Sequence, residues 1–144
     1  MPTSAAKRIV VALLWSSSGL VMQLRDFKHG IDDPGQWGLF GGHLTPKERP
    51  EAGLVRELIE EIGCVPQHID PLGHFDEPDR RIIGFSAVLE IPIDRLVVRE
   101  GHDVGVFAAD DLKQGSLFSQ RCQQSFPMTP ITRRALALWA GLAA

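Results

Sequence analysis

The stretch from residue 42 to residue 64 constrains this chain more than any other, because it fits one short amphipathic helix between two glycines. Five apolar residues recur at the spacing of a single helical face. They are Leu54, Val55, Leu58, Ile59 and Ile62. Pro50 suits the first turn of a helix, and Gly63 suits the left-handed position just past its end. The pattern therefore predicts a helix over residues 50–62.

The polar side of this helix carries three glutamates, Glu57, Glu60 and Glu61. At these spacings like charges repel by about 0.2–0.5 kcal/mol per pair, which a divalent cation would relieve. A solvated acidic face is the commoner meaning of such a run. Here, however, the pair Gly41-Gly42 precedes the helix, and glycine favours a tight turn with close approach of the backbone to a ligand. A cation held by these carboxylates could bind phosphate, which indicates phosphate-ester or phosphoanhydride chemistry.

These residues, together with Glu48 and Arg56, resemble the Nudix box, the signature of the Nudix hydrolases. Its pattern is Gly, five residues, Glu, seven residues, Arg-Glu, an aliphatic residue, any residue, Glu-Glu, any residue, Gly and an aliphatic residue. Eight residues match in register: Gly42, Glu48, Arg56, Glu57, Leu58, Glu60, Glu61 and Gly63. Cys64 holds the last position, a mild departure because cysteine behaves as a small hydrophobe. Residues 98–112 also resemble the strand and short helix that come late in this family.

The resemblance implies a fold of the α/β class, the Nudix-type α/β/α sandwich with a mixed central β-sheet, as a single Nudix hydrolase domain over residues 1–144. The coarse pattern of the chain agrees, since it predicts a mixed sheet with helices on both faces. The expected strands are 8–15, 19–25, 36–40, 66–76, 81–92 and 104–108, and the expected second helix runs from Pro130 to Ala143. Residues 16–19 are expected to form a hairpin turn and residues 32–35 a loop.

The box residues acquire roles through the same resemblance. The implied metal ligands are Glu57, Glu61, Glu60 and the carbonyl of Gly42, with Glu60 as either a ligand or a positioning group. Arg56 would orient the carboxylates by a charge-assisted hydrogen bond, and Glu48 would pair with Arg56. The expected catalytic set within the box is therefore Glu57, Glu60, Arg56 and Glu48.

The general base varies in this family between a box glutamate and a carboxylate on a distant loop. Glu100 and Asp103 flank Gly101-His102 in a predicted loop before a strand, so they are candidates for a base or a further metal ligand. A polar hairpin turn is the structural alternative. His43 and His102 are similar candidates, with an ordinary exposed loop histidine as the alternative.

Four residues are predicted to contact the substrate: Gly41, Gly42, Phe40 and Arg81. Trp37, Phe40 and Phe85 could stack on a nucleobase, although such aromatic residues more often belong to the core. Arg80 or Arg81 could contact a substrate phosphate, with a solvated loop as the alternative.

The activity that the resemblance implies is that of a Mg²⁺-dependent pyrophosphohydrolase, with Mn²⁺ as the alternative ion. Water would attack phosphorus in the diphosphate linkage of a nucleoside triphosphate, ADP-ribose or a nucleotide sugar. The substrate stays open because most subfamily marks are absent: the chain has no tyrosine, and Pro78 only approximates the proline of ADP-ribose hydrolases. One alternative is a catalytically silent Nudix-fold module that binds or senses a nucleotide, but such modules usually lose a box glutamate. Another is an acidic-faced scaffold protein without this chemistry.

Composition narrows the partners and the compartment. Fifteen basic and 18 acidic residues give a net charge of −3, which argues against a nucleic-acid-binding surface. The apolar run at residues 9–14 is too short to span a membrane or act as a signal peptide, and two cysteines make no disulfide framework. We therefore expect a cytoplasmic protein with a small-molecule nucleotide substrate and no membrane partner. A homodimer through the apolar C-terminal helix around Trp139 stays open.

Overall fold

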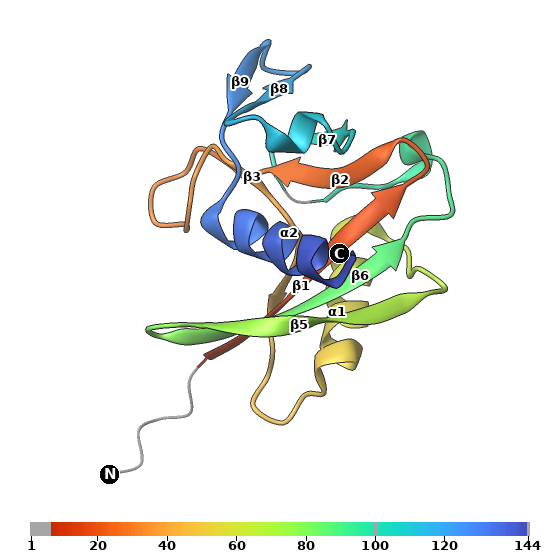
Figure 1. The fold of residues 1–144 in the computed structure, drawn as a ribbon, viewed down its shortest axis with the longest axis vertical. Coiled ribbons are helices and arrows are strands. Elements are labelled where there is room, and N and C mark those ends of the chain that lie inside the picture. Colours follow the sequence, from red (N-terminus) through yellow and green to blue (C-terminus); the bar gives the residue numbers. More distant parts are fainter. Residues whose placement is uncertain (1–6, 100, 144) are drawn as a thin grey trace.

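The computed structural model describes residues 7–99 and 101–143 (Figure 1). Its strands are β1 (Lys7–Ser16), β2 (Gly19–Leu24), β3 (Trp37–Gly38), β4 (Phe40–His43), β5 (Ile69–Glu77), β6 (Arg80–Val88), β7 (Asp103–Phe107), β8 (Leu117–Ser119) and β9 (Gln124–Phe126). Its helices are α1 (Pro50–Ile62) and α2 (Pro130–Ala143), with short 3₁₀ helices η1 (Ile93–Arg95) and η2 (Asp111–Lys113).

Strand β1 organises a mixed sheet of seven strands. It runs parallel to β6 over residues 7–15 and antiparallel to two strands on its other edge. The first half of that edge, residues 9–12, pairs with β4, and the second half, residues 14–16, pairs with β2. Strand β2 in turn pairs with β3 and β7, while β5 closes the other side of the sheet against β6.

The side chains of β1 alternate between two hydrophobic clusters, as expected for a strand with both faces covered. On one face, Val10, Ala12 and Leu14 pack with residues of α1. On the other face, Ile9, Val11 and Leu13 belong to the cluster that includes Ala135 of α2. Figure 1 shows the two helices on opposite sides of the sheet. The predicted α/β sandwich with a mixed central sheet is therefore confirmed.

Helix α1 has the bounds that the sequence predicts. Pro50 lies in its first turn, and Gly63 ends it with φ 69° while donating its N–H to the carbonyls of Leu58 and Ile59, both at 3.1 Å. The expected apolar face is narrower than predicted, because Ile59 is 48% exposed. Leu54, Leu58 and Ile62 carry the packing onto the sheet.

The glycine pair before this helix does not form the predicted tight turn. The expected strand at residues 36–40 is instead two short strands, and Gly41 and Gly42 lie inside the second, β4, opposite Val11 and Val10. Gly41 has φ 145°, and a Cβ there would collide with the carbonyl oxygen of Val10. Glycine is thus required by close strand pairing rather than by a turn.

Elsewhere the predicted strands differ at their ends. The strands expected at 66–76 and 81–92 are β5 and β6, an antiparallel hairpin with a bulge between Pro71 and Gly73. Strand β6 ends at Val88, before Pro92 leads into η1. The hairpin of β8 and β9 lies where no element was expected. Within residues 7–99 and 101–143, no helix is long and apolar enough to cross a membrane.

Candidate active site

Arg56 forms hydrogen bonds to two of the box glutamates and to the backbone before α1. Its guanidinium forms a fork with Glu48, with Nε 2.8 Å from Oε2 and Nη2 2.9 Å from Oε1. Nη1 donates to Oε1 of Glu57 at 2.9 Å, and Nη2 also donates to the carbonyl oxygen of His43 at 3.1 Å. Such bidentate, charge-assisted bonds fix a guanidinium plane and its partners. The predicted pairing of Glu48 with Arg56 is present in the structure.

Glu48 is held as a carboxylate by this arrangement. Hydrogen bonding from Arg56, assisted by the N–H of Thr45 at 3.1 Å, lowers the pKa of Glu48 to about 2. The same contact raises the pKa of Arg56 above its already high value. A further support comes from Arg8 of β1, which donates to the carbonyls of Thr45 and Glu48 at 2.9 and 3.0 Å. The loop before α1 is thus tied to both the helix and the sheet.

Glu57 reaches the edge of the sheet because residue 42 is a glycine. A Cβ at position 42 would lie 2.5 Å from the carboxyl carbon of Glu57, closer than two carbon atoms can approach. The Glu57 side chain is 14% exposed, so its carboxylate lies between the guanidinium of Arg56 and the backbone of β4. The sequence pattern of glycine and glutamate is therefore one packed unit.

Glu61 lies one helical turn after Glu57 and is 1% exposed. Its Oε1 accepts the N–H of Gly41 at 2.9 Å, and its Oε2 accepts Nε2 of Gln23 at 3.2 Å. A buried carboxylate needs such donors, since an uncompensated buried charge is costly. Gln23 is a site residue that the sequence analysis missed, because a polar residue inside an apolar strand gives little sign of its partner.

The donor set fits a hard divalent cation in its chemistry, since it offers the carboxylates of Glu57 and Glu60 and the carbonyl of Gly42. In this structure Arg56 compensates these charges, with Nη1 2.9 Å from Glu57 and 3.7 Å from Glu60. Among the residues that the structure describes, no three His, Cys, Asp or Glu side chains gather as a ready metal cluster. Arg56 therefore balances part of the negative charge of this donor set and orients the Glu57 carboxylate through one of its two oxygens.

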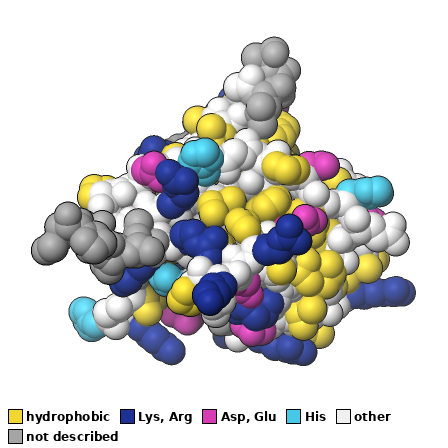
Figure 2. Space-filling model, turned by 90° about the horizontal axis from the view of Figure 1, so that it is seen from below, with side chains coloured by type: hydrophobic (Ala, Val, Ile, Leu, Met, Phe, Trp, Pro, Cys, Tyr) yellow, Lys and Arg dark blue, Asp and Glu magenta, His cyan; other side chains and the backbone are white. Residues whose placement is uncertain are grey.

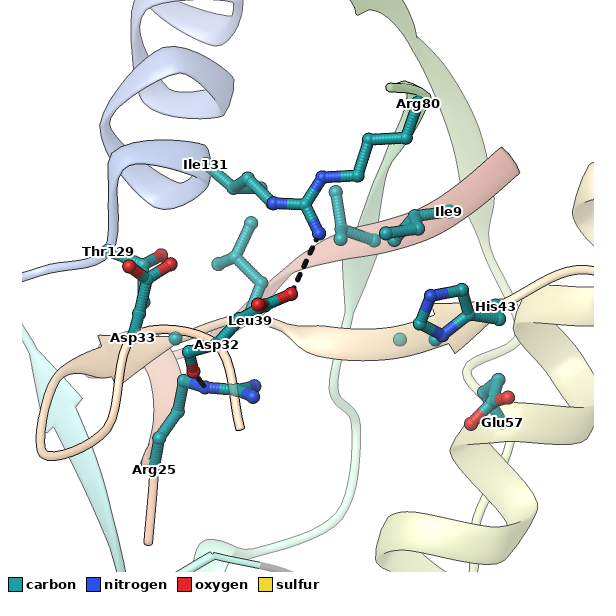
Figure 3. A pocket seen from close by; sticks show the side chains of 14 residues that line it. Ile9, Arg25, Asp32, Asp33, Leu39, His43, Glu57, Arg80, Thr129 and Ile131 are labelled. Carbon is teal, nitrogen blue, oxygen red and sulfur yellow. Dashed lines mark hydrogen bonds and ion pairs between the residues drawn. The ribbon is translucent and has the colours of Figure 1, made fainter. Parts of the chain in front are cut away.

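Glu57 opens onto a hollow of about 350 Å³, a size typical of small-molecule sites (Figure 3). We call it the Glu57 hollow. Its apolar floor comprises Ile9, Val11, Leu39 and Ile131. Its polar lining comprises Glu57, His43, Arg80, Asp32, Asp33, Arg25 and Thr129, together with the backbone of Gly38, Gly41 and Gly42. Floor and walls thus combine apolar contact with groups of both charges.

Several residues of the predicted site lie elsewhere. Phe40 is fully buried in the core, so its side chain has no surface for a substrate, and Trp37 and Phe85 are core residues as well. Arg81 is bonded to Asp76 at 2.8 Å and does not line the Glu57 hollow. Residues alternate across a strand, which places Arg80 rather than Arg81 at the hollow.

Of the two predicted loop carboxylates, Asp103 lies away from Glu57. Asp103 begins β7, where its Oδ2 accepts Oγ of Ser119 at 2.6 Å and its Oδ1 accepts the N–H of Val104 at 2.8 Å. It lines a separate hollow with Trp37 and Phe107. Glu100 lies outside the described residues. His102 packs edge-on against Phe27, with ring centroids 5.1 Å apart, whereas His43 lines the Glu57 hollow.

The far end of the hollow was largely missed by the sequence analysis. Arg25, Asp32, Asp33 and Thr129 come from segments that carry no recognised motif. Asp33 stands out only in the structure, where its φ of 47° is uncommon for a residue other than glycine. The sequence analysis considered Arg80 and Arg81 together for phosphate contact but included only Arg81 in the predicted set, whereas the structure places Arg80 at the hollow.

Comparison with known proteins identifies the class. The family model of the NUDIX domain matches residues 6–123, so the chain belongs to the Nudix family. One curated relative, the nucleoside triphosphatase NudI of Klebsiella pneumoniae, is 46% identical over 46 residues. That match covers 31% of this chain and 33% of the relative, so the chain spans about a third of the relative's length.

Solved structures share the fold at low sequence identity. The NUDIX domain of Shewanella oneidensis NrtR, complexed with ADP ribose, has a TM-score of 0.73 and 17% identity over 99% of this chain and 91% of that chain. The MutT NUDIX hydrolase from Burkholderia pseudomallei has a TM-score of 0.69 and 22% identity over 94% and 98%. A MutT/nudix family protein from Enterococcus faecalis has a TM-score of 0.62 and 22% identity over 74% and 45%.

Proposed function

We propose that this chain is a pyrophosphohydrolase that cleaves the diphosphate linkage of a nucleoside diphosphate derivative with the help of a divalent cation. The observation that carries the proposal is the position of Glu57. Its carboxylate is packed against Gly42, oriented by Arg56, and open to the Glu57 hollow. A negatively charged ligand beside such a carboxylate calls for a cation between them.

The cation that suits this donor set is Mg²⁺, with Mn²⁺ as the alternative, held by Glu57 and Glu60 with the Gly42 carbonyl. Glu61, one turn after Glu57 on the same helix, is proposed as a further ligand. When bound, the ion would neutralise phosphate oxygens and lower the pKa of a bound water. Arg56, held by Glu48, positions the Glu57 carboxylate. Gly41 donates its N–H to the Glu61 carboxylate.

The general base is proposed to be Glu57 or Glu60, since Asp103 is engaged by Ser119 and lies in another hollow. A base must be within hydrogen-bond reach of the attacking water. Glu60 has an exposed side chain at 58%, so it can turn from Arg56 toward the solvent. The apolar floor of the hollow would bind the nucleoside and exclude water from it.

The substrate classes follow from the relatives only as candidates. The curated relative is named a nucleoside triphosphatase, and the NrtR domain was solved with ADP ribose. We therefore rank nucleoside triphosphates and ADP-ribose ahead of nucleotide sugars. The NrtR complex also keeps the alternative of a nucleotide-binding module without turnover, which the intact box glutamates argue against.

The test is a phosphate-release screen with Mg²⁺, coupled to phosphatase and pyrophosphatase, over nucleoside triphosphates, ADP-ribose, nucleotide sugars and dinucleoside polyphosphates. Glu57→Gln should lower turnover on the order of 100-fold or more, as expected for loss of one preorganised electrostatic group. Glu51→Gln is the matched control, because Glu51 is an exposed glutamate in the first turn of the same helix.

Release from one class that is lost in Glu57→Gln and kept in Glu51→Gln would support the hydrolase and identify its substrate class. Near-normal activity in Glu57→Gln would contradict the metal assignment. If no compound is hydrolysed while Mg²⁺ with a nucleotide raises the melting temperature, the binding module is favoured, since a ligand that binds the native state stabilises it.

A further inference from the structure

The loop between β2 and β3, residues 25–36, has a fixed base. The N–H of Arg25 donates to the carbonyl of Gln36 at 2.9 Å, and the N–H of Gly35 donates back to the carbonyl of Arg25 at 3.2 Å. The side chain of Arg25 then reaches along the loop, with Nε 2.7 Å from the carbonyl oxygen of Asp32. These bonds carry the tip of the loop to the wall of the Glu57 hollow.

At the tip, the carboxylate of Asp32 is paired with Nη1 of Arg80 at 3.0 Å (Figure 3). The two partners differ in their surroundings. The Asp32 side chain is 71% exposed, whereas that of Arg80 is 17% exposed. Arg80 is also anchored at its other edge, where Nε donates to Oε1 of Glu77 at 2.7 Å.

This asymmetry decides which partner can leave. Asp32 is largely hydrated already, so its release into water loses little, as for exposed ion pairs in general. Arg80 stays in place on Glu77, and the edge that Asp32 occupies belongs to the wall of the Glu57 hollow. A ligand anion that enters the hollow therefore meets an oriented guanidinium whose present partner is weakly held.

We propose that Arg80 is an anion-binding residue of the substrate site. Asp32 occupies the edge of the Arg80 guanidinium that Glu77 does not hold, until a phosphate group of the substrate replaces it. The identity of the anion rests on the proposed function, whereas the exchange rests on the geometry of the hollow. A guanidinium fork matches the oxygen spacing of a phosphate, and phosphate carries more charge than a carboxylate. The substrate class is thus one whose phosphate groups extend from Glu57 toward Arg80.

Basic side chains occur both on the lower face of the molecule and in the lining of the Glu57 hollow. Figure 2 shows Lys and Arg side chains around a central apolar patch on the face seen from below. In Figure 1 this underside includes the start of β1 and the loop before α1. The lining of the Glu57 hollow itself carries both signs, with Arg25 and Arg80 beside Asp32, Asp33 and Glu57, so attraction of an anion there depends on these two arginines rather than on the net charge of −3.

The test measures binding rather than turnover, so that it does not depend on hydrolysis. The intact protein is titrated calorimetrically with inorganic pyrophosphate, with ADP-ribose and with uncharged guanosine, once with EDTA and once with Ca²⁺ to supply a divalent cation beside Glu57. Asp32→Asn should tighten binding of the two phosphate probes about 2- to 5-fold, because it removes a competing carboxylate. Arg80→Gln should weaken it about 10-fold, the loss expected for a charged hydrogen bond.

The pair formed by Arg81 and Asp76 is a matched control. It joins the same residue types at 2.8 Å, next to Arg80 in sequence, and does not line the hollow. Arg81→Gln and Asp76→Asn should leave the dissociation constants unchanged. Arg80→Lys keeps the charge without the fork and should fall between wild type and Arg80→Gln. Thermal unfolding of each variant checks that it is folded.

The opposite signs of the two central variants are decisive. If Asp32→Asn and Arg80→Gln both weaken phosphate binding, or neither changes it, the ion pair is only structural and the proposal is wrong. It is equally wrong if pyrophosphate and ADP-ribose do not bind, or if guanosine binding responds as the phosphates do, since Arg80 would then contact the base. If the two variants shift phosphate binding in opposite directions but no compound is hydrolysed, this inference stands and the proposed hydrolase function is rejected.

Discussion

The two ends of the Glu57 hollow are built in different ways. At the Glu57 end, four residues come from β4, α1 and the loop between them, within residues 42–57: Gly42, Glu48, Arg56 and Glu57. At the Arg80 end, the loop after β2, strand β6 and the segment before α2 meet from distant parts of the chain. The groups proposed for chemistry are thus local in sequence, whereas the groups that would select a ligand are brought together only by the fold.

The two arginines show the same contrast. Arg56 commits both edges of its guanidinium to box residues, and its fork on Glu48 leaves that pair little freedom. Arg80 divides its bonds between Glu77, which is mostly buried, and Asp32, which is mostly exposed. A rigid arginine suits the orientation of a catalytic carboxylate. An arginine with one loosely held partner suits exchange with a ligand.

The largest effect on the Glu57 end is expected for Gly42→Ala. The new methyl group would meet the carboxyl end of Glu57, a flexible group that can move aside. We expect turnover to fall about 100-fold, as for a catalytic group misplaced by about 1 Å, while the unfolding free energy changes by less than about 1 kcal/mol. Steady-state kinetics and urea denaturation measure the two quantities.

Gly115→Ala is the control for that variant, because a Cβ at Gly115 meets nothing within 4 Å. It should alter neither turnover nor stability. Unchanged turnover in Gly42→Ala would mean that the contact between Glu57 and β4 has no part in catalysis.

A second prediction concerns Asp103, which the sequence analysis proposed as a base. Its carboxylate joins β7 to the β8–β9 hairpin through Ser119 Oγ at 2.6 Å and the N–H of Arg121 at 3.4 Å. Asp103→Asn places an amide donor against the Arg121 donor, so we expect a loss of about 1–3 kcal/mol in unfolding free energy. Urea denaturation measures it, with Asp110→Asn, an exposed aspartate at 96%, as the control.

Turnover decides between the two roles of Asp103. A structural role leaves turnover per folded molecule near that of wild type. A fall in turnover on the order of 100-fold with unchanged stability would instead make Asp103 a catalytic group. The groups proposed for chemistry would then no longer come from one short segment of the sequence.

The smallest effect is the pH dependence of the bond between Arg56 and Glu48. The pKa of Glu48 is lowered from its ordinary 4.5 to about 2, so the folded state favours the carboxylate. The stabilisation is complete above the unfolded value of 4.5 and is lost as the pH falls toward 2. Between about pH 5 and about pH 3, wild type should therefore lose more unfolding free energy than Glu48→Gln.

Urea denaturation at the two pH values measures that difference, and Glu51→Gln, at an exposed position of the same helix, should follow wild type. Parallel pH profiles for wild type and Glu48→Gln would show that the fork stabilises the protonated and the ionised form of Glu48 equally. The Glu57 end would then be no more rigid than the Arg80 end.

Local features of the chain were predictable because they depend on neighbours in sequence. The bounds of α1 and the left-handed cap at Gly63 follow from helical spacing and residue type, whereas the pairing of Glu48 with Arg56 was expected from the resemblance to the Nudix box. The β8–β9 hairpin was not predictable in the same way, since its strands are three residues each and show no clear alternation.

The sequence by itself determined the family, the helix that carries the glutamates and the chemistry that those carboxylates suggest, because all three are written in one short segment. Only the tertiary structure decided that Arg80 rather than Arg81 lines the hollow, that Phe40 is buried and that Asp32 reaches Arg80 across 48 residues. The physical reason is that strand register and the direction of a side chain depend on pairing partners far along the chain, and the side-chain face alternates with every residue.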